Sequence, residues 1–134
     1  MEGVVQLDRL RKVYGDFVAV DDVSLTIARG ELVCLLGPSG CGKTTTLKMI
    51  AGFIAPKSGR IVIAGTDVTD LPPQKRDTGM VFQNYALFPH LSVAENIAFG
   101  PRNVGMARAA IMARVAEMLD LVQMRDYAAR LPSE

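Results

Sequence analysis

A glycine-rich loop between an apolar run and a helix-forming run constrains this chain more than any other feature. Residues 37–45 read GPSGCGKTT and meet the pattern G-x-x-x-x-G-K-[ST] through Gly37, Gly42, Lys43 and Thr44. The preceding apolar run 32–36 predicts a buried strand, and the residues after the loop predict a helix. This order of elements predicts an α/β fold built around a phosphate-binding loop, a P-loop.

Phosphate binding is the chemistry that such a loop supports. Glycines let backbone N–H groups point at an anion, and the new helix adds unpaired N–H groups and its positive dipole end. Lys43 is expected to reach the β- and γ-phosphates of a nucleotide, and the Thr44 hydroxyl to bind Mg²⁺. The alternative, a plain glycine-rich turn with a solvent-facing lysine, is disfavoured by the flanking strand and helix.

Composition limits the possible size, partners and compartment of the protein but does not identify a function. A chain of 134 residues is long enough for one domain with a hydrophobic core. Its net charge of +1 gives no electrostatic case for nucleic acid or an anionic membrane as principal partner. Cys34 and Cys41 show neither metal-site nor disulfide-framework spacing, so a reducing cytoplasmic compartment is expected. No apolar run has the length of a membrane span.

Short apolar segments predict the strands. Alternating apolar residues indicate strands over 4–13 and 17–27, and the short turn between them predicts an antiparallel hairpin. Further strands are expected over 60–64 and over 79–83, where a short apolar run ends in an amide.

Three helices are expected. The first follows the loop and ends near Gly52. The second begins at Ser92, where Glu95 three residues later predicts a capping box, and is expected to end at Gly100–Pro101. The third, over 107–122, is amphipathic. Its apolar stripe comprises Ile111, Val115, Leu119 and Val122, and Met106, Met112, Met118 and Met124 near it are expected to fill the core.

Two residues outside the loop carry possible nucleotide chemistry. Tyr14 lies in a turn before the loop, where it either stacks on a base or is a half-exposed loop tyrosine. Gln83 ends an apolar run, where it either holds Mg²⁺ and an attacking water or bonds to the backbone. The residues themselves leave both choices open.

The sequence resembles the nucleotide-binding subunit of an ABC transporter of the bacterial importer type, over essentially all 134 residues. The matching segments are 37–45, the Ala-Gly pair 51–52, the SGRI stretch 58–61 and, most telling, GMVFQNYALFPHLSVAENI over 79–97. The resemblance implies an α/β P-loop NTPase of the ABC ATPase type. It further implies an N-terminal antiparallel β subdomain, an incomplete RecA-like core and the start of a helical subdomain.

The resemblance also implies roles for individual residues. Tyr14 matches the aromatic residue that stacks on adenine, and Val20 an apolar residue under the same ring. Thr44 and Gln83 would bind Mg²⁺, and Gln83 would also position the attacking water. The residues implied to wrap the phosphates of ATP are Ser39, Gly40, Cys41, Gly42, Lys43, Thr44 and Thr45. Bound nucleotide is therefore expected to protect the Cys41 thiol from alkylation.

The partners implied by the resemblance are membrane permease subunits and a second copy of the ATPase subunit, at the cytoplasmic face of the inner membrane. The permease would dock near Tyr85–Leu91. The apolar residues Tyr85, Leu87 and Phe88 fit either a docking patch or the subunit's own core, and composition does not separate these choices. His90, the one histidine, is expected to be structural.

One part of the family pattern is missing from residues 1–134. Hydrolysis needs a carboxylate at the end of a second apolar strand, but residues 61–63 end in Ala64-Gly65, and Asp120 lies on a predicted helix. We therefore expect residues 1–134 to be the N-terminal part of such a nucleotide-binding domain, without its signature, Walker B and switch regions. Such a piece is expected to expose apolar sheet edge and to bind ATP without turning it over.

The leading interpretation is the ATP-binding motor subunit of an import system, with polyamines as the favoured solute. A small-molecule kinase would need an arginine-rich lid, which the sequence lacks. A non-catalytic nucleotide-binding module and a soluble, non-transport ABC ATPase remain as alternatives.

Overall fold

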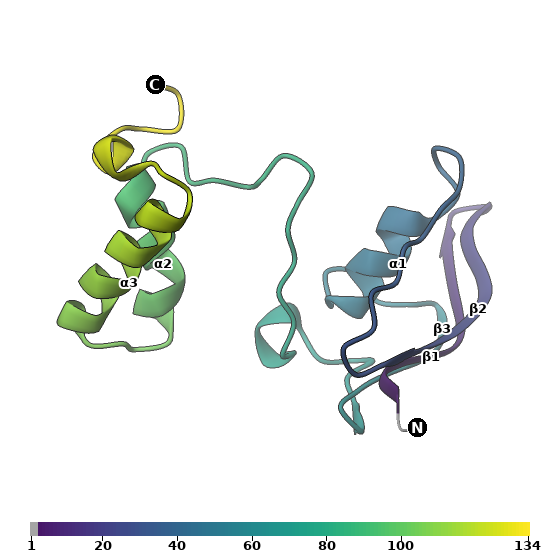
Figure 1. Ribbon diagram of the computed structural model, residues 1–134. Coiled ribbons are helices and arrows are strands. Elements are labelled where there is room, and N and C mark those ends of the chain that lie inside the picture. The colour runs from purple at the N-terminus through teal and green to yellow at the C-terminus, as the bar shows by residue number, and fades with distance from the viewer. Residues whose placement is uncertain (1–2) are drawn as a thin grey trace. The chain divides into compact units, whose positions relative to one another are not determined.

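The computed structural model describes residues 3–134, which form two compact units that divide after Met80 (Figure 1). The first unit contains β1 (Gly3–Tyr14), β2 (Phe17–Ala28), α1 (Lys43–Ile50), β3 (Ser58–Ile63), β4 (Thr66–Asp67) and the 3₁₀ helix η1 (Pro73–Lys75). The second unit contains α2 (Val93–Asn103), α3 (Arg108–Leu121) and the 3₁₀ helix η2 (Arg125–Tyr127).

The sheet of the first unit has the strand order β2-β1-β3-β4, with each neighbouring pair antiparallel. The predicted hairpin of β1 and β2 is confirmed, and Tyr14 pairs with Phe17 at its closed end. Apolar side chains on one face of the strands meet helix α1, whose Met49 is fully buried. The core cluster comprises Leu7, Leu10, Val20, Met49, Ile61, Ile63 and Val68.

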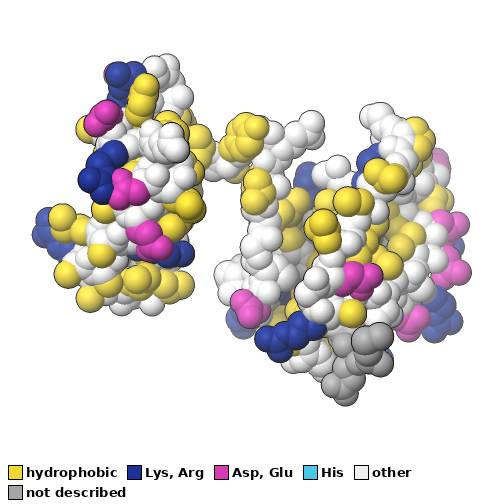
Figure 2. All heavy atoms as spheres, viewed as in Figure 1, with side chains coloured by type: hydrophobic (Ala, Val, Ile, Leu, Met, Phe, Trp, Pro, Cys, Tyr) yellow, Lys and Arg dark blue, Asp and Glu magenta, His cyan; other side chains and the backbone are white. Residues whose placement is uncertain are grey.

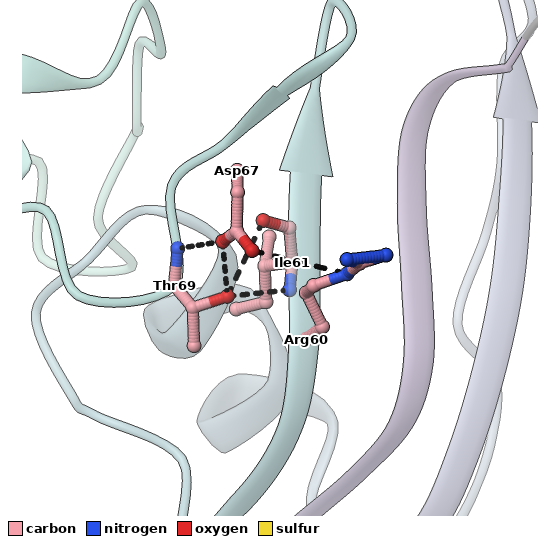
Figure 3. A network of polar contacts seen from close by, with 4 residues as sticks. All are labelled: Arg60, Ile61, Asp67 and Thr69. Carbon is pink, nitrogen blue, oxygen red and sulfur yellow. Dashed lines mark hydrogen bonds and ion pairs between the residues drawn. The ribbon is translucent and has the colours of Figure 1, made fainter.

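A polar network closes the hairpin of β3 and β4 (Figure 3). The Thr69 hydroxyl donates to Asp67 Oδ1 at 2.6 Å and accepts from the Ile61 backbone N–H at 2.9 Å. The hydroxyl and the backbone N–H of Thr69 both donate to Asp67, which holds the pKa of this carboxyl below its ordinary value. Arg60 adds an ion pair at 3.8 Å. These contacts fix the two-residue strand β4.

Helix α1 ends as predicted but is capped by a residue that the sequence did not single out. Gly52 follows the helix with φ +84°, a left-handed conformation that favours glycine. The buried Arg76 guanidinium donates to the carbonyls of Met49 (2.7 Å), Ile50 (2.8 Å), Leu71 (2.8 Å) and Thr69 (3.0 Å). Arg76 therefore joins the end of α1 to the segment after β4.

Two predicted strands do not form. Residues 32–36 and 79–83 are irregular, and no strand of the described residues pairs with either segment. The predicted burial before the loop is also wrong, since Leu32 is 90% and Leu36 is 92% exposed. A strand needs neighbours to satisfy its backbone N–H and C=O groups, and the described sheet offers none here. Apolar side chains are exposed (Figure 2), but Leu32 and Leu36 belong to an irregular segment and not to the apolar sheet edge that was expected.

The second unit is a helical hairpin of α2 and α3. The predicted capping box is confirmed: Glu95 N–H donates to Ser92 Oγ at 3.2 Å, and Ser92 N–H donates to Glu95 Oε2 at 2.8 Å. The predicted end at Gly100–Pro101 is wrong, because α2 continues to Asn103. Proline lacks a backbone N–H and so removes one helical hydrogen bond, but the chain continues as a helix past Pro101, and Val104 N–H donates to the Gly100 carbonyl at 3.3 Å.

Helix α3 occupies nearly the predicted range, but its predicted stripe is only partly buried. Ile111 and Leu119 are buried, whereas Val122 is 56% exposed. Met112, at 65% exposure, does not fill the core, nor do Met106 and Met124, which are also exposed. An apolar stripe is buried only where another element covers it, and the described hairpin covers part of this one.

Candidate nucleotide-binding site

The P-loop lies against strand β2, and this contact explains the second glycine of the motif. Gly42 precedes α1 with φ +88°, and a Cβ atom added there would lie 2.3 Å from the carbonyl oxygen of Ala19. A side chain at this position would therefore collide with the β2 backbone and strain its own. Glycine allows the helix N-terminus to approach the strand and leaves the loop N–H groups uncovered.

Lys43 lies within the loop rather than in solvent. Its ammonium donates to the carbonyls of Gly37 (2.6 Å) and Pro38 (2.7 Å), and it lies 3.3 Å from the Cys41 Sγ atom. Buried Thr46 donates from its hydroxyl to the Gly42 carbonyl at 2.9 Å and so fixes the first turn of α1. The one cation of the loop is thus held where the helix dipole also favours negative charge.

The loop and the end of the β1–β2 hairpin enclose a cavity of about 360 Å³. All seven residues expected to wrap phosphates line it, and so does Tyr14. The lining comprises Tyr14, Phe17, Ala19, Ser39, Gly40, Cys41, Gly42, Lys43, Thr44 and Thr45. This cavity joins an aromatic ring, a phosphate-binding loop and the exposed Thr44 side chain, which are the parts that a nucleoside triphosphate requires.

Val20 is not part of this cavity. Its side chain is 5% exposed in the hydrophobic core, and it lines a second cavity of about 390 Å³ with Cys34 and Leu35. Ala19 lines both cavities. Val20 nevertheless lies beside the loop, because a Cβ atom added at Gly42 would be 3.1 Å from its Cγ2 atom, and Cys41, Gly42 and Lys43 line the second cavity with it.

Sequence reasoning also missed Phe17. This residue lines the cavity together with Tyr14, its partner in the β1–β2 pairing. The predicted hairpin was the signal that could have found it, because residues on either side of a short turn lie opposite one another.

Tyr14 is 46% exposed, and Lys12 holds its ring. The Lys12 ammonium lies 5.2 Å from the ring centroid and donates to the Ala55 carbonyl at 2.7 Å. A cation above an aromatic ring is attracted to the electron-rich face. Tyr14 is therefore held on one face by a lysine that is itself anchored, and it borders the cavity.

The predicted magnesium ligands belong to different units. Thr44 lies in the first turn of α1, whereas Gln83 is exposed in the turn 83–86 of the second unit. A hydroxyl and an amide oxygen are hard donors of the kind Mg²⁺ accepts, so the residue types fit the ion. No cluster of three His, Cys, Asp or Glu residues suited to a metal occurs within residues 3–134. The Thr44–Gln83 pair stays a prediction.

The segment Tyr85–Leu91 is exposed and held in a defined shape. Tyr85 is 76% and Leu87 55% exposed, so these two side chains do not belong to the core of their unit. Phe88 packs on Phe99 with ring centroids 4.3 Å apart. Asn96 accepts from Phe88 N–H (2.9 Å) and donates to the carbonyls of Phe88 (3.1 Å), Leu91 (3.0 Å) and Ser92 (3.0 Å).

The loop, its cavity and the elements around it define a P-loop protein. Residues 20–134 match the family described as ABC transporter, so the chain belongs to that family. A solved dimeric ATP-binding cassette, MJ0796, in a post-hydrolysis state with ADP and Pi, has the same fold with a TM-score of 0.85 and 30% identity. The match covers 96% of this chain and 62% of that one. The fold is therefore that of part of an ABC-type ATPase.

Curated relatives come from import systems. The spermidine/putrescine import ATP-binding protein PotA of Acidothermus cellulolyticus is 54% identical over 97% of this chain. The Fe(3+) ions import ATP-binding protein FbpC of Agrobacterium fabrum is 52% identical, and the putative 2-aminoethylphosphonate import ATP-binding protein PhnT of Salmonella typhimurium is 54% identical, each over 98% of this chain. The chain spans 35% to 37% of the length of these relatives. No helix of the described residues is long and apolar enough to cross a membrane.

Proposed function

We propose that this chain is the ATP-binding part of the motor subunit of an import system, in which ATP binding and hydrolysis drive solute uptake. The observation that carries the proposal is the single cavity shared by Tyr14, Lys43, Thr44 and the rest of the loop. The import relatives support the transport role, since they match nearly the whole chain.

Different residues of the cavity bind different parts of Mg-ATP. The free face of Tyr14 receives the adenine ring, while the loop N–H groups and the Lys43 ammonium bind the phosphates. Phosphate oxygens replace the carbonyls of Gly37 and Pro38 as acceptors for Lys43. The Thr44 hydroxyl and the Gln83 amide would hold Mg²⁺, which neutralises charge that develops on the phosphates.

The proposed partners are a second copy of the subunit and membrane permease subunits, at the cytoplasmic face of the inner membrane. The exposed Tyr85–Leu91 segment is the proposed permease contact, supported by the exposure of Tyr85 and Leu87. Polyamines are the favoured solute. Iron and aminoethylphosphonate relatives match almost equally well. We therefore expect the permease and its binding protein, rather than this chain, to select the solute.

Nucleotide titration of the intact protein tests the proposal. Isothermal titration calorimetry with Mg-ATP should show binding that falls at least tenfold in Lys43→Ala, because the variant lacks the ammonium at the phosphates. Lys48→Ala, on the same helix but outside the cavity lining, is the matched control. Equal affinity in the wild type and Lys43→Ala would contradict the nucleotide site. Failure of a tagged subunit to co-purify with a membrane permease would contradict the transport role.

A further inference from the structure

We propose that Phe17 is a second aromatic wall of the nucleotide site, which contacts the base and sets the preference for a purine. The proposal rests on the proposed function, since it assigns a further residue to the same site. The new element is Phe17 itself, a side chain on β2 that lies outside the P-loop motif.

Strand pairing places Phe17 beside Tyr14. The two residues are directly opposite one another at the closed end of the β1–β2 hairpin. Side chains of such a pair stand on the same face of the sheet with Cβ atoms about 5 Å apart. Both line the cavity that Lys43 and Thr44 also line. The hairpin therefore offers two neighbouring rings, not one, to the cavity.

The surroundings of the two rings differ. Lys12 covers one face of Tyr14, whereas Phe17 is 60% exposed, and no ring of the described residues packs against it. A large apolar side chain at the closed end of a short hairpin contributes little to the core when it is this exposed. Its exposed area is available to a ligand in the cavity, and the base is the apolar part of a nucleotide.

The neighbouring residue Val18 supplies the contrast. Val18 is 40% exposed, yet it is absent from the lining of the cavity within the described chain. Strand pairing distinguishes the two residues, because Phe17 is opposite Tyr14 whereas Val18 is opposite Val13. An exposed apolar residue on β2 is thus not enough for contact with the base, and Phe17 is distinguished by its place beside Tyr14 in the cavity lining.

Binding of two ligands to the intact protein tests the role of Phe17. In calorimetry, Phe17→Ala should weaken Mg-ATP binding roughly five- to twentyfold, as expected when one base–aromatic contact is lost. Binding of inorganic tripolyphosphate, which has no base, should stay within about twofold of the wild type. Phe17→Trp should keep the affinity for Mg-ATP. The Phe17→Ala substitution should lower the affinity for Mg-CTP less than the affinity for Mg-ATP, because a pyrimidine presents a smaller ring.

Two matched variants separate this proposal from the proposed function. Val18→Ala should leave both affinities unchanged, and thermal unfolding should show that Phe17→Ala is folded. Lys43→Ala should lower the affinities for Mg-ATP and for tripolyphosphate together. If Lys43→Ala loses both ligands while Phe17→Ala binds Mg-ATP like Val18→Ala, the nucleotide site stands and the role of Phe17 is overturned. An equal loss of ATP and tripolyphosphate in Phe17→Ala would also overturn it.

Discussion

Arg76 shows how one side chain can fix segments that are far apart in the sequence. Its guanidinium is buried and donates to carbonyls at the end of α1 and in the segment 69–71. Burial lowers the pKa of this guanidinium from its ordinary value, yet the four carbonyl acceptors and the negative end of the helix dipole favour the cation. Gly52 makes room for it, since a Cβ atom there would lie 2.6 Å from Arg76 Nε.

Replacing Arg76 should therefore destabilise the first unit. Arg76→Met, similar in length but without donors, should lower the free energy of unfolding by about 2–4 kcal/mol, because several buried carbonyls lose their partners. The free energy of unfolding of Arg76→Lys should lie between those of the wild type and Arg76→Met, since one ammonium cannot reach all four acceptors. Urea denaturation followed by circular dichroism measures the change, with exposed Lys75→Met as control. Equal midpoints for Arg76→Met and Lys75→Met would contradict this account.

Among single residues, the sequence predicted those whose role depends on a short stretch of neighbouring residues. The P-loop residues follow from a motif and the role of Tyr14 from the resemblance to the family, and the structure brings them to one cavity. Arg76 and Phe17 were missed because their roles depend on which segments pack beside them. A charged residue in a polar connection gives no sign in the sequence that four carbonyls will surround it.

Among the elements, α2 begins with the most complete local signal in the chain. Hydrogen bonds donated by the Ser92 backbone and hydroxyl, both at 2.8 Å, lower the pKa of the Glu95 carboxyl from its ordinary value. A group whose pKa is lowered on folding stabilises the fold fully above its unfolded-state pKa. That contribution is lost as the pH falls through the lowered value.

The pH dependence of stability should therefore change in Glu95→Gln. Wild-type protein should lose stability as the pH falls below the ordinary glutamate pKa of about 4.3, and part of that loss should disappear in the variant. A neutral glutamine can still accept from Ser92, so the variant should remain folded near pH 7. Thermal unfolding from pH 7 to pH 3 measures this, with exposed Glu117→Gln as control. Superimposable profiles for Glu95→Gln and the wild type would refute the assignment.

Asn96 connects helix α2 to the exposed segment Tyr85–Leu91. Asn96→Asp keeps the size of the side chain and an acceptor oxygen. It removes the amide N–H groups that donate to three backbone carbonyls. A carboxylate would instead face those carbonyls, so the segment should open while α2 persists. We expect backbone amides of residues 85–91 to exchange at least tenfold faster with deuterium, and binding to the proposed permease partner to weaken. Asn103→Asp, at the end of the same helix, should change neither.

Elements were predicted well where their signals are local. The β1–β2 hairpin, α1, the capping box and α3 all lie close to their predicted ranges. Residues 32–36 and 79–83 read as strands because their composition is apolar, but a strand forms only with a neighbour to pair with. Pairing across long separations is not encoded in either segment alone, which is why these two predictions failed.

For the whole molecule, the described residues contain two compact units, and the proposed chemistry draws on both. The first unit holds the phosphate cavity, and the second holds Gln83 and the segment Tyr85–Leu91. The resemblance over 79–97 predicted the family, which the match over residues 20–134 shows. Hydrolysis requires more than a phosphate cavity, because a positioned carboxylate must organise Mg²⁺ and the attacking water.

Residues 1–134 produced alone should therefore bind Mg-ATP but not turn it over. No apolar run within them ends in a carboxylate placed like the one this chemistry needs. Exposed Leu32 and Leu36 should also make residues 1–134 marginally stable. Release of phosphate from Mg-ATP, measured with a coupled assay, should equal that of Lys43→Ala and of buffer. Steady hydrolysis that disappears in Lys43→Ala would show that the first 134 residues contain a complete catalytic site.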